Sequence, residues 1–486
     1  MKRNFHLSNG RNADLSAAEI EDLRQGTWSV DCPRLEVRQR GSSTPRVFIG
    51  PGHFRQNEHG RLAYKLYAPR PKDFKKAYKE ESGEAGTIIP ESGFYDVTAL
   101  DYKAREWKSE RVLPGAWNWS ASREPIVTGT LDTMWCEGKI PADVQAEGSS
   151  LGFLVFEKIE IPRNAHTSEH HHIAGWSRSH SYGTNAWRFR AAGFGFLLAN
   201  DRKDTLQIRA STKAESWPSF IEERILESLF WVLGHPIYPT VTERRCGHST
   251  RCTLYSRRRP LAGTRHKPPL LLELLIDEKT NKITAEPYRK LFERYLTHCL
   301  AFEERRHPLW AQLNAIYEAS AASFIDAQAL TLAVSIESIL GREFPDLGHP
   351  SDAERRAVDE GAAFLKTWNG DKVLKERMIG SIKALKSARV GDKMRVLAEQ
   401  GAITKETAKA WQKLRNVNTH TYQTHGLSPD EFRNLLSVVQ TLFSQLIFHT
   451  LGYKGIYNDY SVPDWPLKRY PPLKAERATG KEINSP

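Results

Sequence analysis

The chain lacks any hydrophobic run of the roughly 18 residues that a membrane-spanning helix needs. Its opening residues are basic but are not followed by an apolar stretch, so we expect no secretory signal. Cysteine is scarce: the five residues are odd in number and scattered, which argues against a disulfide framework and favours a reducing compartment. We therefore expect a cytoplasmic protein without a membrane segment.

Several catalytic signatures are missing too. The sequence contains no glycine-rich phosphate-binding loop, no dinucleotide-binding fingerprint and no G-x-S-x-G turn, so nucleotide hydrolysis and serine-hydrolase chemistry are disfavoured. With 40% hydrophobic and 26% charged residues, the composition is typical of globular proteins. A length of 486 residues is too great for one core and favours two or three domains.

Acidic residues are absent from one basic stretch, residues 244–272, in a chain whose net charge is +12. Such a stretch is either a solvated loop or strand edge, or a surface that contacts the phosphates of RNA. Arginine suits the second role because its planar guanidinium donates two parallel hydrogen bonds to a phosphate. The candidate RNA-binding residues are Arg244, Arg245, Arg251, Arg257, Arg258 and Arg259.

The sequence pattern changes near residue 285. Residues 1–285 contain short runs of β-branched and aromatic residues separated by Gly, Pro, Asn and Asp, which predicts a mostly antiparallel sheet or sandwich. One helix is expected among them, at residues 216–234, with Ser216 or Ser219 as its N-cap and Gly234 as its end.

Residues 286–455 show helical periodicity almost throughout and predict a helical bundle. Residues 323–341 are apolar nearly all round, so we expect a central buried helix that ends at Gly341. In residues 286–306 the apolar positions share one helical face: Tyr288, Leu291, Phe292, Tyr295, Leu296 and Cys299. The last helix should begin with a capping box of Ser428 and Glu431.

Residues 456–486 are rich in proline, and we expect them to form an irregular tail that is disordered at its end. The predicted fold class is therefore α+β and multidomain. A β-rich N-terminal region, residues 1–285, would sense a signal or select a substrate, and an all-α helical bundle, residues 286–455, would follow it.

Arg415, Asn416 and His420 crowd the end of the penultimate predicted helix, in the sequence LRNVNTH. Asn416 and His420 are four residues apart and share a helical face, and the long side chain of Arg415 can reach the same point. Histidine can transfer the proton of a ribose 2′-OH near neutral pH, and arginine can stabilise the negative charge of a phosphorane. Asparagine can fix the histidine tautomer or hold a phosphate oxygen. These groups suit metal-free RNA cleavage without a cofactor, and a solvated helix face is the alternative.

The helical region resembles a HEPN domain, the bundle of many RNA-targeting toxins, defence effectors and CRISPR nucleases. The family signature is R-x4-6-H, often with asparagine directly after the arginine, and LRNVNTH has that form. The helix that carries Glu337 in SIESIL resembles a family helix with an acidic residue, although a structural carboxylate remains the alternative. The closing run GYKGIYNDYSVPDWP is similar to the end of Apea-like HEPN proteins, which have a β-rich N-terminal region.

The resemblance implies a metal-independent endoribonuclease of phage defence that acts by abortive infection, as a toxin that stops translation or growth. It implies a homodimer in which two signature helices form one composite site, with Arg415 and His420 catalytic and Asn416 in support. Cleavage would leave 2′,3′-cyclic phosphate and 5′-hydroxyl ends. The expected partners are RNA, with tRNA one candidate, and a trigger, with a phage component one candidate.

Other interpretations stay open at this point. The same bundle could bind RNA or a nucleotide without cutting, or could serve as an interaction module. A third alternative is metal-dependent chemistry in the histidine-rich N-terminal segment, which chelation would abolish. His425 could be a second proton-transfer group, although a polar turn residue is the simpler interpretation. We expect metal sites neither in the histidine-rich run Glu169–His172 with His180, where adjacent histidines on a strand point to opposite faces, nor at Cys246, His248 and Cys252, which lack a second Cys pair.

Overall fold

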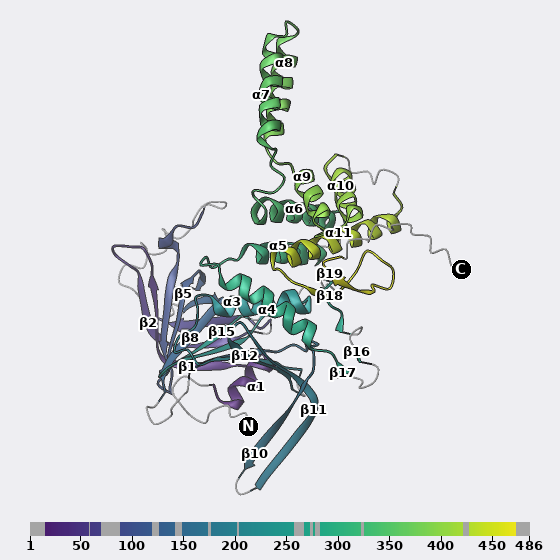
Figure 1. The fold of residues 1–486 in the computed structure, drawn as a ribbon. Helices are drawn as coiled ribbons and strands as arrows, with labels where there is room; N and C mark the ends of the chain where they lie inside the picture. Colours follow the sequence, from purple (N-terminus) through teal and green to yellow (C-terminus); the bar gives the residue numbers. More distant parts are fainter. Residues whose placement is uncertain are drawn as a thin grey trace, which may run out of the picture. The chain divides into compact units, whose positions relative to one another are not determined.

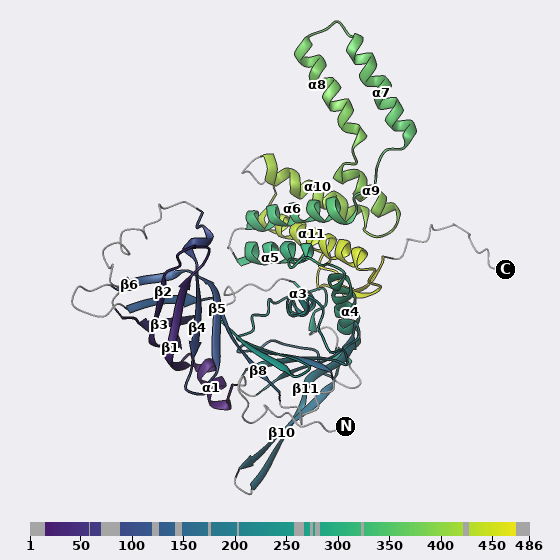
Figure 2. The ribbon, with the colours of Figure 1, turned by 90° about the vertical axis from the view of Figure 1, so that its left-hand side faces the viewer.

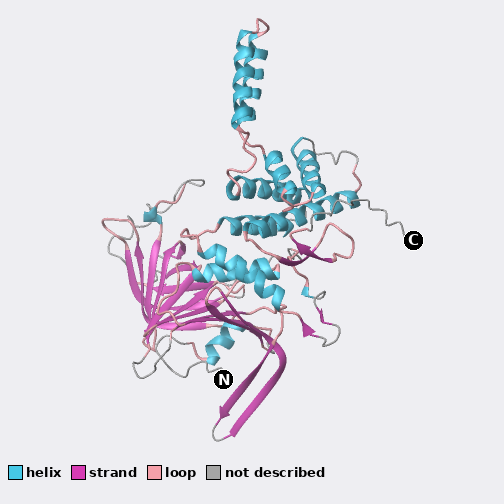
Figure 3. Ribbon diagram, in the orientation of Figure 1, coloured by secondary structure: helices cyan, strands magenta, loops and turns pink. Residues whose placement is uncertain are grey.

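The computed structural model describes residues 15–57, 59–69, 88–118, 126–140, 148–173, 176–201, 204–256, 267–272, 276–277, 282–321, 325–420 and 427–472. Most of the strands precede residue 286 and most of the helices follow it (Figures 1 and 3). The chain divides into two compact units. Unit 1 comprises Met1–Leu226, Pro236–Pro260 and Ile276–Ala285, and unit 2 comprises Glu227–His235, Leu261–Leu275 and Glu286–Pro486.

Unit 1 is built on one antiparallel sheet that, among the described residues, has 15 strands. They are β1 (Ser29–Gln39), β2 (Val47–Gln56), β3 (Leu62–Tyr67), β4 (Tyr95–Leu100), β5 (Glu106–Val112), β6 (Pro114–Asn118), β7 (Ile126–Leu131), β8 (Thr133–Lys139), β9 (Ser149–Val155), β10 (Ala165–Ile173), β11 (Trp176–Ala191), β12 (Phe194–Asn200), β13 (Leu206–Thr212), β14 (Val241–Cys246) and β15 (Ser249–Tyr255). Their order is β10-β11-β12-β13-β9-β14-β15-β8-β5-β4-β1-β2-β3-β7-β6. The predicted β-rich, antiparallel N-terminal region is confirmed.

One end of this sheet curls over a core of its own. Asp132 alone separates β7 from β8, yet β7 pairs with β3 and β8 pairs with β5. The strands β5, β4, β1, β2 and β3 therefore form a curved sheet. Its two outer strands, β5 and β3, pair with β8 and β7, which are neighbours along the chain. Alternate residues of these strands point inward, as the period of a β-strand requires. The enclosed core includes Trp28, Leu35, Val37, Phe54, Tyr64, Leu66, Val97 and Trp107.

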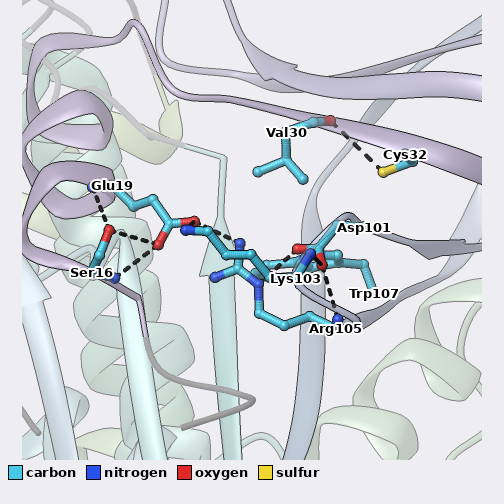
Figure 4. A network of polar contacts seen from close by, with 8 residues as sticks. All are labelled: Ser16, Glu19, Val30, Cys32, Asp101, Lys103, Arg105 and Trp107. Atoms are coloured by element: carbon cyan, nitrogen blue, oxygen red, sulfur yellow. Dashed lines mark hydrogen bonds and ion pairs between the residues drawn. The ribbon is translucent and has the colours of Figure 1, made fainter. Parts of the chain in front are cut away.

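A buried ion-pair network joins helix α1 (Ala17–Gln25) to the turn between β4 and β5 (Figure 4). Arg105 donates from Nε to Asp101 Oδ2 at 2.7 Å and from Nη2 to Glu19 Oε1 at 2.6 Å. Trp107 Nε1 donates to the same Asp101 oxygen at 3.0 Å. Burial by itself would raise the pKa of Glu19, but hydrogen bonds from Arg105 and from Ser16 outweigh it and lower that pKa to about 2.

Unit 2 contains most of the helices. The longer helices of the chain after α1 are α3 (Ile221–Leu233), α4 (Glu286–Leu300), α5 (Pro308–Ala321), α6 (Ile325–Glu343), α7 (Asp352–Thr367), α8 (Lys372–Lys383), α9 (Val390–Glu399), α10 (Lys405–His420) and α11 (Pro429–Thr450). The shorter elements are η1 (Glu91–Gly93), η3 (Ala384–Lys386), β16 (Ile276–Asp277), β17 (Lys282–Ile283), β18 (Gly455–Asn458) and β19 (Leu467–Tyr470).

Two helices follow their sequence signals closely. All six residues of the predicted apolar face of α4, from Tyr288 to Cys299, are buried. In α11, Ser428 accepts a hydrogen bond from the backbone N–H of Glu431 and the Glu431 side chain accepts one from the Ser428 N–H, so the predicted capping box is confirmed. Gly234 (φ 66°) and Gly452 (φ 60°) adopt the left-handed conformation just past the ends of α3 and α11.

Helix α6 differs from its prediction. It continues past Gly341 to Glu343, because Gly341 does not adopt a positive φ there. It packs against α5, α10 and α11, but one face stays uncovered, with Leu330 45% and Val334 55% exposed. The expectation of burial all round is therefore wrong. Apolar composition indicates which residues can be buried, whereas the number of neighbouring helices decides how many faces of a helix are actually buried.

Helices α7 and α8 pack on each other and extend beyond the other helices of unit 2 (Figure 2). Only Ala362 and Leu365 are buried in α7, and none of the residues of α8 is buried. Both segments have the amphipathic pattern expected of a bundle helix, yet several of their apolar side chains face solvent. The exposed apolar residues of this hairpin and of the following η3 are Phe364, Trp368, Val373, Leu374, Met378 and Leu385.

The domain limits also differ from the prediction at two places. Residues 227–235 and 261–275 belong to unit 2, although they precede residue 286. The reason for the first is Trp231, whose ring lies 6.1 Å from that of Tyr295 and 6.2 Å from that of Phe448. Residues 455–472 are not an irregular tail: β18 pairs with β19, and Tyr457 and Tyr470 are buried.

Candidate functional site

Helix α10 carries the LRNVNTH motif and is held by one buried face. Thr407, Trp411 and Leu414 lie four and then three residues apart on this face, and all three are buried. Trp411 also donates from Nε1 to the backbone oxygen of Ala333 on α6 at 3.4 Å. Arg415, which follows Leu414, consequently lies at the edge of the contact between α10 and α6.

Arg415 forms an ion pair with Glu337 on α6, with Nε 2.5 Å from Oε1. Its guanidinium carbon lies 6.0 Å from the centre of the Trp411 ring, a cation–π distance. The two charged side chains stay 44% and 32% exposed. The carboxylate and the indole thus fix the direction of the guanidinium, and solvent still reaches it. A ligand phosphate can approach the same surface.

The other two residues of the motif lie on the same helix. Asn416 is exposed, next to Arg415. His420 is the last residue of α10, and its backbone follows that of Asn416 by four residues, which places both on one side of the helix. The side chain of His420, and the whole of His425, lie outside the described part of the structure. Of the predicted catalytic set, the structure therefore describes the side chains of Arg415, Asn416 and the supporting Glu337.

The basic stretch is less positive in space than it is along the chain. Its described arginines lie on β14 and β15, and each forms an ion pair with a carboxylate, from α3, from β8 or, for Arg245, from β14 itself. The ion pairs are Arg244 with Glu222 at 3.8 Å, Arg245 with Glu243, and Arg251 with Glu137 at 3.9 Å. Arg251 also lies 4.4 Å from the ring centre of Trp135. Arg257, Arg258 and Arg259 are outside the described residues.

The two segments weighed as metal sites give no ligand cluster within the described residues. Glu169–His172 lies on β10 and His180 on β11, where Glu169 pairs with His180 in register, and their side chains are outside the described part. Cys246 and Cys252 lie on β14 and β15, and Cys252 is buried opposite Cys136 of β8. None of the five cysteines, all of which are among the described residues, forms a disulfide bond.

A buried polar cluster in unit 2 was not anticipated from the sequence. Glu227, Cys299 and His307 bring one carboxylate oxygen, one sulfur and one ring nitrogen within 4.8 Å of one another. The sequence pattern places Cys299 only on the apolar face of residues 286–306, and Glu227 only in the helix predicted at residues 216–234. The available signal was weak: a glutamate among the apolar residues of EERILESLFWVL, and a histidine directly before the proline that begins α5.

No protein-family model matches the chain, and no curated protein or solved structure matches it. Among the described residues, no helix has both the length and the apolar character that crossing a bilayer requires. The functional interpretation therefore rests on the sequence motif and on the geometry around Arg415.

Proposed function

We propose that this chain is a metal-independent endoribonuclease of the HEPN type, with its active site at the end of α10. The observation that carries the proposal is the ion pair of Arg415 and Glu337. The resemblance singled out these two residues separately, although they are 78 positions apart in the sequence, and they meet in the fold. An exposed arginine held by a carboxylate and an aromatic ring is preorganised for a phosphate, which lowers the reorganisation needed in the transition state.

In this proposal the ribose 2′-oxygen attacks the adjacent phosphorus, and the bond from phosphorus to the 5′-oxygen breaks. His420 transfers a proton, Arg415 stabilises the phosphorane charge, and Asn416 orients the histidine or a phosphate oxygen. Glu337 is a positioning residue that acts through Arg415. The products are a 2′,3′-cyclic phosphate and a 5′-hydroxyl.

The reaction needs both a base and an acid, whereas the motif supplies one histidine per chain. We propose that a second copy of the chain supplies the other histidine. Leu330, Val334 and Glu337 lie four and then three residues apart, on one side of α6, and the two apolar residues are exposed. An exposed apolar strip beside the site favours association of two copies there, with a two-fold axis that brings both α10 ends together.

The dimer proposal has a matched test. Val334→Lys should convert the dimer to a monomer in size-exclusion chromatography with light scattering, and should reduce RNA cleavage. Val373→Lys introduces the same change at an exposed valine on α8 and should leave both unchanged. A Val334→Lys protein that remains dimeric would place the interface elsewhere.

We further propose that unit 1 keeps the nuclease silent until a trigger, such as a phage component, arrives. The reason is toxicity, because an endoribonuclease that is always active would stop the growth of its own host. Abortive infection would be the biological outcome.

The proposal is tested by incubating purified wild type and His420→Ala with total cellular RNA in EDTA and mapping the product ends. We expect cyclic phosphate ends from wild type and none from His420→Ala, with RNA affinity retained. Lys413→Ala, which removes an exposed charge from the same helix, should cut normally. Equal cutting by wild type and His420→Ala would refute the proposal. If neither cuts, the growth of cells that overexpress each protein decides. Growth arrest by wild type but not by His420→Ala supports a nuclease that awaits its trigger. Equal growth with both proteins supports a non-catalytic binding protein.

A further inference from the structure

A buried cluster of three potential metal ligands lies inside unit 2. Glu227 lies at the middle of α3, Cys299 lies near the end of α4, and His307 directly precedes α5. All three residues are buried, and at most 2% of any of them is exposed. The cluster therefore joins three segments of the chain. Glu227 precedes Cys299 by 72 residues in the sequence.

The distances between the three ligand atoms resemble one face of a tetrahedron. Cys299 Sγ lies 3.6 Å from His307 Nδ1 and 3.6 Å from Glu227 Oε1, and His307 Nδ1 lies 2.9 Å from Glu227 Oε1. In tetrahedral zinc sites the metal–ligand bonds are about 2.0–2.3 Å, so the ligand atoms are about 3.3–3.6 Å apart. Both sulfur distances agree with this spacing, and the nitrogen–oxygen distance would have to lengthen by a few tenths of an ångström.

From this geometry we propose that Glu227, Cys299 and His307 bind a structural zinc ion. Thiolate, imidazole and carboxylate together form a donor set that suits zinc better than magnesium or calcium, which prefer oxygen ligands alone. The charges also balance. One thiolate and one carboxylate neutralise Zn²⁺, so the complete site can be buried without a net charge.

The surroundings of the cluster fit a metal site. Tyr295 donates its hydroxyl hydrogen to Glu227 Oε1 at 2.8 Å, which is the kind of outer contact that orients a ligating carboxylate. Three protein ligands leave the fourth position of a tetrahedron open. His298 lies beside them, with its ring centre 5.3 Å from that of His307, and its Nε2 is buried with no hydrogen-bond partner among the described residues. Its ring nitrogens are not among the ligand atoms that lie within 4.8 Å of one another, so a His298 ligand would require its side chain to turn, and a water is the other candidate for the fourth position.

The role of this zinc would be structural. It would tie α3, whose Trp231 packs against Tyr295, to α4 and to the segment that begins α5. A buried ion of this kind contributes its binding free energy to folding. The competing interpretation is a metal-free network, in which Glu227 accepts hydrogen bonds from Tyr295 and His307. The two interpretations differ in metal content, and neither depends on RNA cleavage.

The first experiment measures the metal content of the full chain, produced in zinc-supplemented medium and purified without chelators or metal-affinity resin. Elemental mass spectrometry should find about one zinc per chain, and removal of that zinc under mild denaturation should lower the melting temperature by about 5 °C or more. Less than about a tenth of a zinc per chain, with no rise in melting temperature on addition of zinc, would overturn the proposal and favour the metal-free network.

Variants locate the ion. Cys299→Ser and His307→Gln should each lose most of the zinc, whereas Cys252→Ser, a change at another buried cysteine, should retain it. Full retention by both ligand variants would place the ion elsewhere and overturn the assignment. Should the ligand variants fail to fold, cobalt loading of the refolded wild-type chain replaces them. A thiolate-to-cobalt charge-transfer band in the wild type that is also present in Cys252→Ser supports the site. Absence of this band from the cobalt-loaded wild type overturns the proposal.

Discussion

Arg415 on α10 and Glu337 on α6 are ion-paired, with Nε 2.5 Å from Oε1, and both side chains remain partly exposed. An exposed pair of this kind stabilises a protein by about 0–1 kcal/mol, because solvent screens the charges. Its stabilising effect is therefore too small to be its main consequence. Its larger effect is geometric: it fixes where the guanidinium points, at the end of the helix that carries Asn416 and His420.

The first prediction concerns Glu337→Gln. We expect the free energy of unfolding to change by less than about 1 kcal/mol, since the pair is exposed. RNA cleavage should fall about tenfold or more, which corresponds to about 1.4 kcal/mol of lost transition-state stabilisation. Denaturant titration and single-turnover cleavage measure the two effects. Glu318→Gln, at an exposed glutamate of α5, serves as control. Cleavage by Glu337→Gln at the wild-type rate would rule out the positioning role.

Arg415→Lys separates charge from geometry. Lysine keeps the positive charge but lacks the planar fork that can bind two phosphate oxygens and pair with Glu337 at once. We expect RNA affinity to change by less than about threefold, because the charge is kept, while the cleavage rate falls by about 10²-fold. Filter binding and cleavage kinetics test this. Wild-type cleavage by Arg415→Lys would mean that charge alone is sufficient.

In unit 1, the predicted effect of removing a carboxylate depends on burial. Asp101→Ala should destabilise the chain by about 3 kcal/mol or more, because it leaves the buried Arg105 without one of its two partners. Asp96→Ala breaks an ion pair with Arg40 of similar length, 2.7 Å, but the Asp96 side chain is 37% exposed. We expect a loss of less than about 1 kcal/mol there. Similar losses for both variants in chemical denaturation would contradict this explanation.

The same network predicts a loss of stability in acid. The pKa of Glu19 is lowered from 4.5 to about 2 in the folded chain, so folding favours its charged form. Its contribution is complete above about pH 4.5 and is lost as the pH falls toward about 2. Glu19→Gln removes this titration. The stability difference between wild type and Glu19→Gln should therefore shrink across that window, and a constant difference would show that Glu19 does not titrate there.

Adjacent residues of α7 provide a matched pair of substitutions. Leu365 is buried, whereas Phe364 is 73% exposed. Leu365→Ala should destabilise the hairpin by about 2 kcal/mol through the cavity it leaves, and Phe364→Ala by less than about 0.5 kcal/mol. Hydrogen exchange of the α7 and α8 amides resolves the two effects. Equal losses would mean that the solvent-facing side of the hairpin is covered in solution.

Local pattern was enough to predict the elements around the site. Helix α4 buries the face that its spacing indicates, and α11 begins with its capping box and ends just before Gly452, because these features depend on residues within one or two turns. The motif containing Arg415 lies at the end of a helix for the same reason. The class of the N-terminal region also followed from alternation and turn residues, which are local properties of the chain.

Contacts between distant residues could not be predicted in that way. The charge run from Arg244 onward has no acidic residue along the chain, yet Glu222 of α3 and Glu137 of β8 approach it in the fold. Composition likewise did not indicate that one face of α6 stays open, or that residues 455–472 form a hairpin. Such features depend on which elements become neighbours, and neighbours are chosen by the packing of the whole chain.

The sequence by itself determined most of the helices and strands and the presence of Arg415, Asn416 and His420 on one helix, because the period of the backbone sets which residues share a face. Only the tertiary structure decided that Glu337 meets Arg415 across 78 residues, and that Glu227 meets Cys299 across 72. The physical reason is that side chains from separate elements meet only where burial of apolar surface brings those elements together.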